Sequence, residues 1–224
     1  MLTAAYSVHI LVLCIAGHTN QAATTVWTLL HALRSPLLER LRDAQSTDLL
    51  DATFRESGRL YTNLLLLRRI TVTQYILGRP IAKGTFVACS PVVTARDHNI
   101  YTDPEKFLPE RWLTETGELD EVRIKILHRL GASIQFGKGQ HACMGERLAR
   151  FMVLEVLWGT ILGDDEDLGF DVAIVSGLKE GVGIDNVGIE AAWAEENLGT
   201  PSAKGGPVLL RFARRRPRLG TDSE

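Results

Sequence analysis

The sequence has few cysteines, and they are far apart. The chain of 224 residues contains only three, at positions 14, 89 and 143. An odd number at this spacing excludes a disulfide framework and the paired cysteines of a structural zinc site. We therefore expect free thiols in a reducing environment and no disulfide-linked partner.

An excess of charge is also lacking. Lys and Arg number 25 and Asp and Glu number 27, which gives a formal net charge of −2. Proteins that bind nucleic acid need a basic surface for the phosphates, so this balance argues against nucleic acid as a partner. One basic cluster stands out, Arg211–Arg218. We interpret it as a solvated edge or tail, and the alternative is contact with an anionic surface or a redox partner.

A membrane-spanning apolar run is absent as well. The apolar stretch from Ala4 to Ala16 falls short of the roughly 20 residues that cross a bilayer, and it lacks a basic leader. The helical pattern continues instead through polar residues to Leu33 and stops at Pro36. We therefore predict a buried helix here, and neither a signal peptide nor a membrane anchor.

What is present is the composition of an ordinary globular protein, with 45% hydrophobic and 23% charged residues. The length allows one large domain or two small ones. Apolar spacing predicts helices over residues 3–33, 48–61 and 146–162. Runs of β-branched residues between 68 and 93, and again near the C-terminus, predict short strands. The expected fold class is mainly α with a small β portion.

Halfway along the first predicted helix lies a small, polar notch, Ala16-Gly17-His18-Thr19-Asn20. A glycine inside a helix costs about 1 kcal/mol relative to alanine, so Gly17 needs a compensating reason. A widened helical turn beside a ligand is one such reason. Close packing of another helix at a small residue is the other.

Residues with chemical potential gather just ahead of the last predicted helix. Cys143 lies where unpaired N–H groups and the positive end of the helix dipole favour a thiolate. Gly137, Gly139 and Gly145 allow the backbone to turn tightly toward a flat ligand. His141 can donate to an anionic group beside that ligand. The alternative is a small, inert, buried cysteine, and zinc or redox-thiol chemistry lacks partner cysteines.

These residues, with three distant motifs, resemble a known family. The loop Phe136–Gly145 resembles the haem-binding signature of the cytochrome P450 monooxygenases. Glu56-Ser-Gly-Arg59 is similar to the family's Glu-x-x-Arg helix, and Pro109-Glu-Arg111-Trp112 to its aromatic-ended Pro-Glu-Arg motif. Ala16–Thr19 resembles the oxygen-binding groove of its long central helix. Because the motifs follow the family's order, the implied fold is the C-terminal part of the cytochrome P450 fold.

The resemblance implies a haem b cofactor whose iron is ligated by the thiolate of Cys143. An electron-rich thiolate favours cleavage of the O–O bond. His141 would donate to one haem propionate, and Arg68, or its competitor Arg69, to the other. Phe136 would pack against the haem edge near the sulfur. The implied cofactor-binding residues are Cys143, His141, Arg68, Phe136, Gly139 and Gly145.

The resemblance also implies a structural triad. Glu56, Arg59 and Arg111 would form a buried group of ion pairs that fixes the core on the haem side. A buried carboxylate is tolerable only when it is paired and hydrogen-bonded, which two arginines provide. An exposed helical pair worth about 0.3–0.5 kcal/mol would suit Glu56 and Arg59 but would leave Arg111 unexplained.

In the central helix, the resemblance implies that Thr19 assists proton delivery beside a groove opened by Gly17. Many family members carry an acidic residue before this threonine, whereas this chain has His18. In that respect the chain is similar to the sterol-demethylase-like branch. Histidine can relay protons near neutral pH, so His18 joins Thr19 and Gly17 as a candidate catalytic residue.

The implied reaction is insertion of one oxygen atom from O2 into an apolar organic substrate, sterol-like or a secondary metabolite. NADPH would supply electrons through a separate reductase. Residues 1–224 would form a partial cytochrome P450 domain without its N-terminal half. Complete eukaryotic members work at the cytoplasmic face of the endoplasmic-reticulum membrane. The alternative is a truncated, non-catalytic remnant or interaction fragment whose apolar helix faces lack partners.

Overall fold

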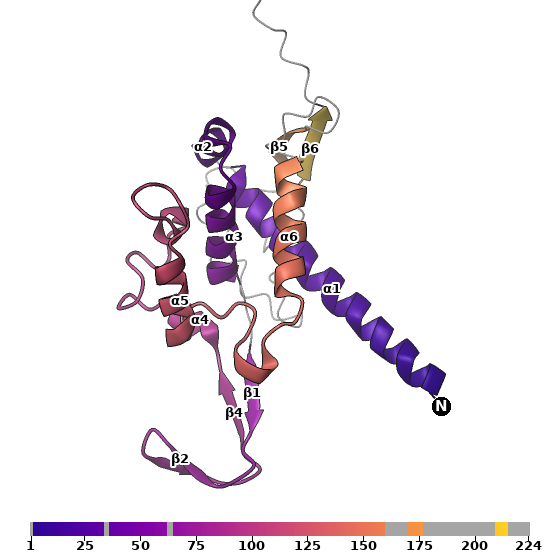
Figure 1. The fold of residues 1–224 in the computed structure, drawn as a ribbon, viewed down its shortest axis with the longest axis vertical. Coiled ribbons are helices and arrows are strands. Elements are labelled where there is room, and N and C mark those ends of the chain that lie inside the picture. Colours follow the sequence, from indigo (N-terminus) through magenta and orange to yellow (C-terminus); the bar gives the residue numbers. More distant parts are fainter. Residues whose placement is uncertain (1, 34–35, 62–64, 160–169, 177–208, 215–224) are drawn as a thin grey trace, which may run out of the picture.

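The computed structural model describes residues 2–33, 36–61, 65–159, 170–176 and 209–214. Helices dominate these ranges, and the strands form three small antiparallel sheets of two strands each (Figure 1). The predicted fold class, mainly α with a small β portion, is confirmed.

The long helix α1 spans Leu2–Ala32, as predicted (Figure 1). Only its C-terminal part is buried, with Trp27 and Leu30 less than a tenth exposed. The apolar residues of its first half are open to solvent, for example Ile10 at 62% and Leu13 at 66% exposure. The prediction of a buried helix is therefore wrong for the first half, because no other described element packs around it. Within the described ranges, no helix has the length and apolar character that a membrane span requires.

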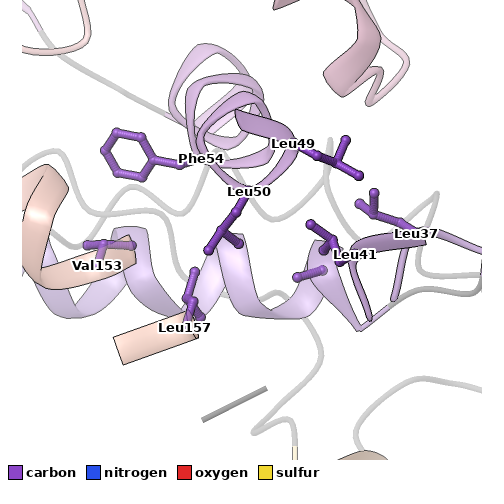
Figure 2. Close-up of a cluster of buried hydrophobic side chains, with 8 residues drawn as sticks. Leu37, Leu41, Leu49, Leu50, Phe54, Val153 and Leu157 are labelled. Carbon is purple, nitrogen blue, oxygen red and sulfur yellow. The ribbon is translucent and has the colours of Figure 1, made fainter. Parts of the chain in front are cut away.

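The main core lies where α1 meets three shorter helices, α2 (Leu37–Ala44), α3 (Thr47–Tyr61) and α6 (Glu146–Leu157). Figure 2 shows Leu49 and Leu50 of α3 pointing toward leucines of α2 and α6, and Phe54 belongs to the same cluster. The helix predicted over 48–61 is α3, and it is buried along almost its whole length. The helix predicted over 146–162 is described as far as Leu157 in α6. α3 is thus the central element of the described core.

The strands lie in or directly beside the regions where β-branched residues predict them, and β1 begins two residues earlier than predicted. β1 pairs with β4, β2 with β3, and β5 with β6, all antiparallel. Their bounds are Leu66–Arg69 and Phe86–Cys89, Gln74–Ile76 and Arg79–Ile81, and Phe170–Ser176 and Leu209–Arg214. The basic cluster begins at Arg211 on β6, and its residues after 214 lie outside the described part.

The segment after β4 is mostly irregular but well packed. It contains two short helical turns, α4 (Pro91–Ala95) and η1 (Pro109–Trp112). Tyr101 and Trp112 are fully buried and belong to a second apolar cluster. The irregular but packed segment is as predicted.

Three helices, α2, α4 and α5 (Glu121–Leu130), are not among those that the apolar spacing predicts, and α5 is the longest of them. It begins at Asp120, whose side chain accepts a hydrogen bond from the backbone N–H of Arg123 at 2.8 Å. It ends at Gly131, which has a left-handed φ of 74°. These caps stabilise a short helix that buries only Ile124 and Leu127.

Candidate active site

The cysteine loop is shaped by two glycines in left-handed conformations. Gly137 and Gly139 have φ values of 76° and 69°, which residues with a side chain rarely adopt. A Cβ on Gly137 would also lie only 3.0 Å from the carbonyl oxygen of His141. The backbone N–H of Cys143 donates to the carbonyl oxygen of Phe136 at 2.7 Å and closes the loop. The glycines therefore allow a tight turn that ends at the cysteine.

Cys143 ends this loop with its side chain exposed. α6 begins shortly after it, and Gly145 at the N-cap has no side chain that could accept from the first turn. A Cβ on Gly145 would lie 3.8 Å from the sulfur of Cys143, so the backbone passes close to the thiol. An exposed thiol beside a helix N-terminus can serve as a thiolate ligand. Cys143 is therefore not the buried cysteine of the alternative.

Two other cysteines, Cys14 and Cys89, are also free and exposed. Across the described residues, no three His, Cys, Asp or Glu side chains come together to hold a metal ion. A zinc centre with several protein ligands therefore has no support in that part of the chain.

The predicted propionate partners are exposed. His141 ends the short helical turn η2 (Gly139–His141). Arg68 lies on β1, and its guanidinium donates to the carbonyl oxygen of Leu67 at 2.7 Å. Its competitor Arg69 lies over the ring of Phe86 on β4, with 6.0 Å between the guanidinium carbon and the ring centroid. Successive strand residues point to opposite faces, so only one of these arginines can face a given ligand.

The structure brings Glu56, Arg59 and Arg111 together. The carboxylate of Glu56 is fully buried. Arg59 donates two hydrogen bonds to it, from Nη2 to Oε1 at 2.8 Å and from Nε to Oε2 at 2.9 Å. Arg111 adds a third, from Nε to Oε1 at 2.9 Å. The alternative interpretation, an exposed helical pair, is therefore wrong. The three side chains form a buried group of ion pairs.

Two further donors complete this group, and the sequence motifs do not assign them. The indole Nε1 of Trp112 donates to Oε2 of Glu56 at 2.9 Å, and the backbone N–H of Leu108 donates to Oε1 at 3.0 Å. Trp112 is detectable in the sequence as the aromatic end of the Pro-Glu-Arg motif. The contact from Leu108 depends on the fold alone. The buried carboxylate thus accepts five hydrogen bonds, which replace the water that it loses on burial.

Both arginines also fix the irregular segment after α4. Arg59 and Arg111 direct their remaining N–H groups at backbone carbonyl oxygens there. The accepting oxygens lie 2.6 to 3.2 Å from the guanidinium nitrogens and belong to Ala95 at the end of α4 and to Thr102, Asp103, Pro104 and Lys106 after it. The two arginines therefore join the Glu56 carboxylate to the backbone of this irregular segment.

Tyr101 connects the triad to the stretch that leads to the cysteine loop. Its ring lies under both guanidinium groups, with 4.9 Å from the Arg59 carbon and 5.8 Å from the Arg111 carbon to the ring centroid. Its hydroxyl donates to the carbonyl oxygen of Ala132 at 3.1 Å. Burial raises the pKa of Tyr101 to about 12, because the charged form would lose its hydration. The phenol is therefore neutral at physiological pH.

The predicted catalytic residues of the central helix lie on a regular part of α1. His18 is exposed, and the side chain of Thr19 lies outside the described part. Nothing lies within 4 Å of a Cβ placed on Gly17. A widened turn and close helix packing, the two reasons expected for Gly17, are therefore both absent from the described structure. The described structure therefore brings neither Gly17 nor the side chain of His18 into a packed groove.

Comparison with known proteins identifies the family of this arrangement. The sequence model described as Cytochrome P450 matches residues 4–163, more than half of the chain. Cytochrome P450 monooxygenase pyvB of Aspergillus violaceofuscus is 33% identical, over 63% of this chain and 30% of its own length. Cytochrome P450 monooxygenase pynD of Aspergillus niger is 30% identical, over 68% of this chain and 34% of its own length.

A similar protein from bacteria extends the comparison. A sterol 14alpha-demethylase of Mycolicibacterium vanbaalenii is 28% identical, over 69% of this chain and 36% of its own length. The chain thus spans about a third of the length of these curated relatives. The matched range contains the cysteine loop, the Glu56 triad and the notch of α1. The chain therefore belongs to the cytochrome P450 family.

Proposed function

We propose that this chain carries the haem-ligand site of a cytochrome P450 monooxygenase, with Cys143 as the axial thiolate. The observation that supports this most is the loop closed by the Cys143 N–H and the Phe136 oxygen at 2.7 Å. The sulfur is exposed at the end of this glycine-shaped loop, next to the start of α6. A haem-thiolate centre needs one protein sulfur presented in this way.

The other donors fit the same group. A haem has a flat apolar ring and two carboxylates. His141 and Arg68 are exposed N–H donors that could hold the two propionates, with Arg69 as the competing choice. Phe136 is half-buried beside Cys143 and offers a ring for the haem edge. Gly139 and Gly145 keep the backbone around the sulfur free of side chains.

The protein's part in the reaction is to hold, orient and supply protons. When bound, the haem supplies the oxidation of an apolar substrate by O2. Cys143 would donate electron density through its sulfur, and the Glu56 triad would keep the loop-side core rigid. His18 and Thr19 would pass protons from solvent, since a histidine exchanges protons near neutral pH.

We extend the proposal to substrate, partner and location. An apolar substrate of the sterol or secondary-metabolite class agrees with the name of the mycobacterial relative, a sterol 14alpha-demethylase. NADPH would deliver electrons through a separate reductase. On family resemblance alone, the complete protein would act at the cytoplasmic face of the endoplasmic-reticulum membrane. Co-sedimentation of the complete protein with microsomes tests this location, and a soluble distribution would contradict it.

The reduced carbon monoxide difference spectrum tests the ligand directly. The chain is expressed with haem, purified and reduced, and the spectrum is compared between wild type, Cys143→Ala and Cys89→Ala. Cys89 is the matched control, because it is also a free, exposed cysteine. We expect the thiolate Soret band in wild type and Cys89→Ala and its loss in Cys143→Ala. A band that survives in Cys143→Ala would disprove the assignment.

The alternative is a non-catalytic remnant or interaction fragment. The exposed apolar side chains of α1 and α6, including Leu13 at 66% and Phe151 at 61% exposure, favour this reading. The same experiment separates the two functions. A folded chain that takes up no haem under any loading condition would support the remnant and refute the haem site.

A further inference from the structure

Two contacts with α3 flank the loop that carries Cys143, and neither involves the Glu56 triad. One precedes the loop at Gln135 and one follows it at Arg150. We propose that these contacts position Cys143 by fixing both ends of its loop on α3. This proposal rests on the proposed function of Cys143 as the haem ligand. It can nevertheless be tested on the haem-free chain.

The first contact depends on a glycine in the interior of α3. Gly58 is buried, and a Cβ placed there would overlap the side-chain Oε1 and Cδ of Gln135 and lie 2.9 Å from its Nε2. The Gln135 amide therefore rests against the bare helix backbone. Glycine is unfavourable in a helix interior relative to alanine, so this close approach gives Gly58 a physical reason. Gln135 directly precedes Phe136, where the loop starts.

The second contact is an ion pair at the far end of the loop. Asp51 of α3 is 2% exposed, and it accepts a hydrogen bond from Nε of Arg150 at 2.9 Å and another from its Nη2. Paired, nearly parallel hydrogen bonds from a guanidinium fix both distance and orientation. Arg150 lies in the first turns of α6, directly after the loop. The pair therefore sets where α6 begins relative to α3.

The two anchor points share one face of α3. Asp51 and Gly58 are seven residues apart, which corresponds to two helical turns and a rise of about 10 Å. α3 is a rigid spacer of fixed length, so it sets the separation between the two ends of the loop. Phe54 lies between the anchors, and its ring stacks near that of Phe136 with centroids 6.2 Å apart. The loop that presents Cys143 is thus held against one face of one helix.

Amide hydrogen exchange of the haem-free chain tests the first anchor. The observed group is the N–H of Cys143, which closes the loop on Phe136. Gly58→Ala inserts the overlapping Cβ, and we expect exchange at Cys143 to become at least about fivefold faster. Gly17→Ala is the matched control, because a Cβ there meets nothing within 4 Å, and its loop exchange should stay unchanged. In a chain that already carries Gln135→Ala the overlapped amide is gone. Adding Gly58→Ala to that chain should therefore accelerate exchange at Cys143 no further.

The same measurement tests the second anchor. We expect Arg150→Gln to accelerate exchange at Cys143 by a similar factor and Arg150→Lys to restore part of the protection. Arg147→Gln is the matched control, an exposed arginine on the same helix. Asp51→Asn combined with Arg150→Gln should be no faster than the more affected single variant, because both remove the same contact.

An internal reference separates local from global effects. Amides of α5 (Glu121–Leu130) report the stability of the body outside the loop. If the variants accelerate exchange in α5 and at Cys143 by the same factor, or leave Cys143 unchanged, the positioning role is refuted. Because the exchange is measured without haem, a chain can show both anchors and still fail to bind haem. Failure of the anchors and failure of the haem site are therefore distinguishable.

Discussion

Replacing Glu56 by glutamine is expected to remove a large part of the stability of the described core. The carboxylate is fully buried and receives all of its hydrogen bonds from donors, two of them cationic side chains. Glutamine has nearly the same shape but no charge, so the guanidinium groups of Arg59 and Arg111 lose their buried counter-ion. Its amide nitrogen is itself a donor and must face another donor, such as the indole N–H of Trp112.

The magnitude follows from the burial. Breaking a buried ion pair by neutralising one partner typically costs about 3–5 kcal/mol, because a charge is left without compensation. A small globular protein has about 5–15 kcal/mol of stability in total. Glu56→Gln should therefore lower the free energy of unfolding by at least about 3 kcal/mol, or prevent folding at physiological temperature.

Urea unfolding followed by circular dichroism measures this loss. The control is Glu121→Gln on α5, whose carboxylate is 58% exposed and lies 3.9 Å from the ammonium of Lys125. That exposed pair should change stability by less than about 0.5 kcal/mol. If Glu56→Gln unfolds within about 1 kcal/mol of wild type, the buried carboxylate does not hold the two arginines as argued.

Three smaller predictions concern other parts of the core. Burial raises the folded-state pKa of Tyr101 from 10.0 to about 12, so its contribution to stability is complete below pH 10 and is lost as the pH rises toward 12. Urea unfolding should show that the free energy of unfolding of wild type falls by roughly 2–3 kcal/mol across this pH range and that of Tyr101→Phe falls by less. An equal fall in the two proteins would contradict the prediction. Asp120→Ala removes the N-cap of α5 and should cost about 1 kcal/mol, with faster amide exchange confined to α5; unchanged exchange there would argue against the cap. Leu157→Ala should cost about 2–5 kcal/mol in thermal or urea unfolding, since this side chain is 1% exposed, and a loss below 1 kcal/mol would mean the site is loosely packed.

Strong periodicity made the long helices predictable, whereas short, capped elements were not. α1 and α3 have apolar residues at helical spacing over several turns, so their bounds follow closely from the sequence. α5 buries only two apolar residues, and its caps at Asp120 and Gly131 are its clearest signals. A single Asp and a single Gly occur too often in loops to predict a helix by themselves.

Burial along α1 could not be predicted from its own residues. An apolar helical run predicts burial only where another element covers it, and in the described chain the first half of α1 is uncovered. The glycine at 17 illustrates the same limit, because its expected close neighbour is not there. No sequence pattern singled out Gly58. It is nevertheless this glycine, and not Gly17, that lies against a side chain distant in sequence, that of Gln135.

The sequence predicted which residues make up the candidate site, but it did not predict the contacts that join them to distant segments. The motif resemblance brought Glu56, Arg59 and Arg111 together correctly, since three-residue spacing on a helix puts the first two on one face. The hydrogen bond from Leu108 and the contact between Gln135 and Gly58 depend on segments that meet only in the folded chain. Such contacts carry no local pattern, so only the structure reveals them.

X-ray absorption at the iron edge tests the central claim, the ligation of haem iron by Cys143, most directly. The haem-loaded wild-type chain should show a sulfur atom in the first coordination shell of the iron. Cys143→Ala should lose that sulfur signal, and Cys89→Ala, which removes another free, exposed cysteine, should keep it. A wild-type shell of nitrogen and oxygen alone, or a sulfur signal that persists in Cys143→Ala, would contradict the account.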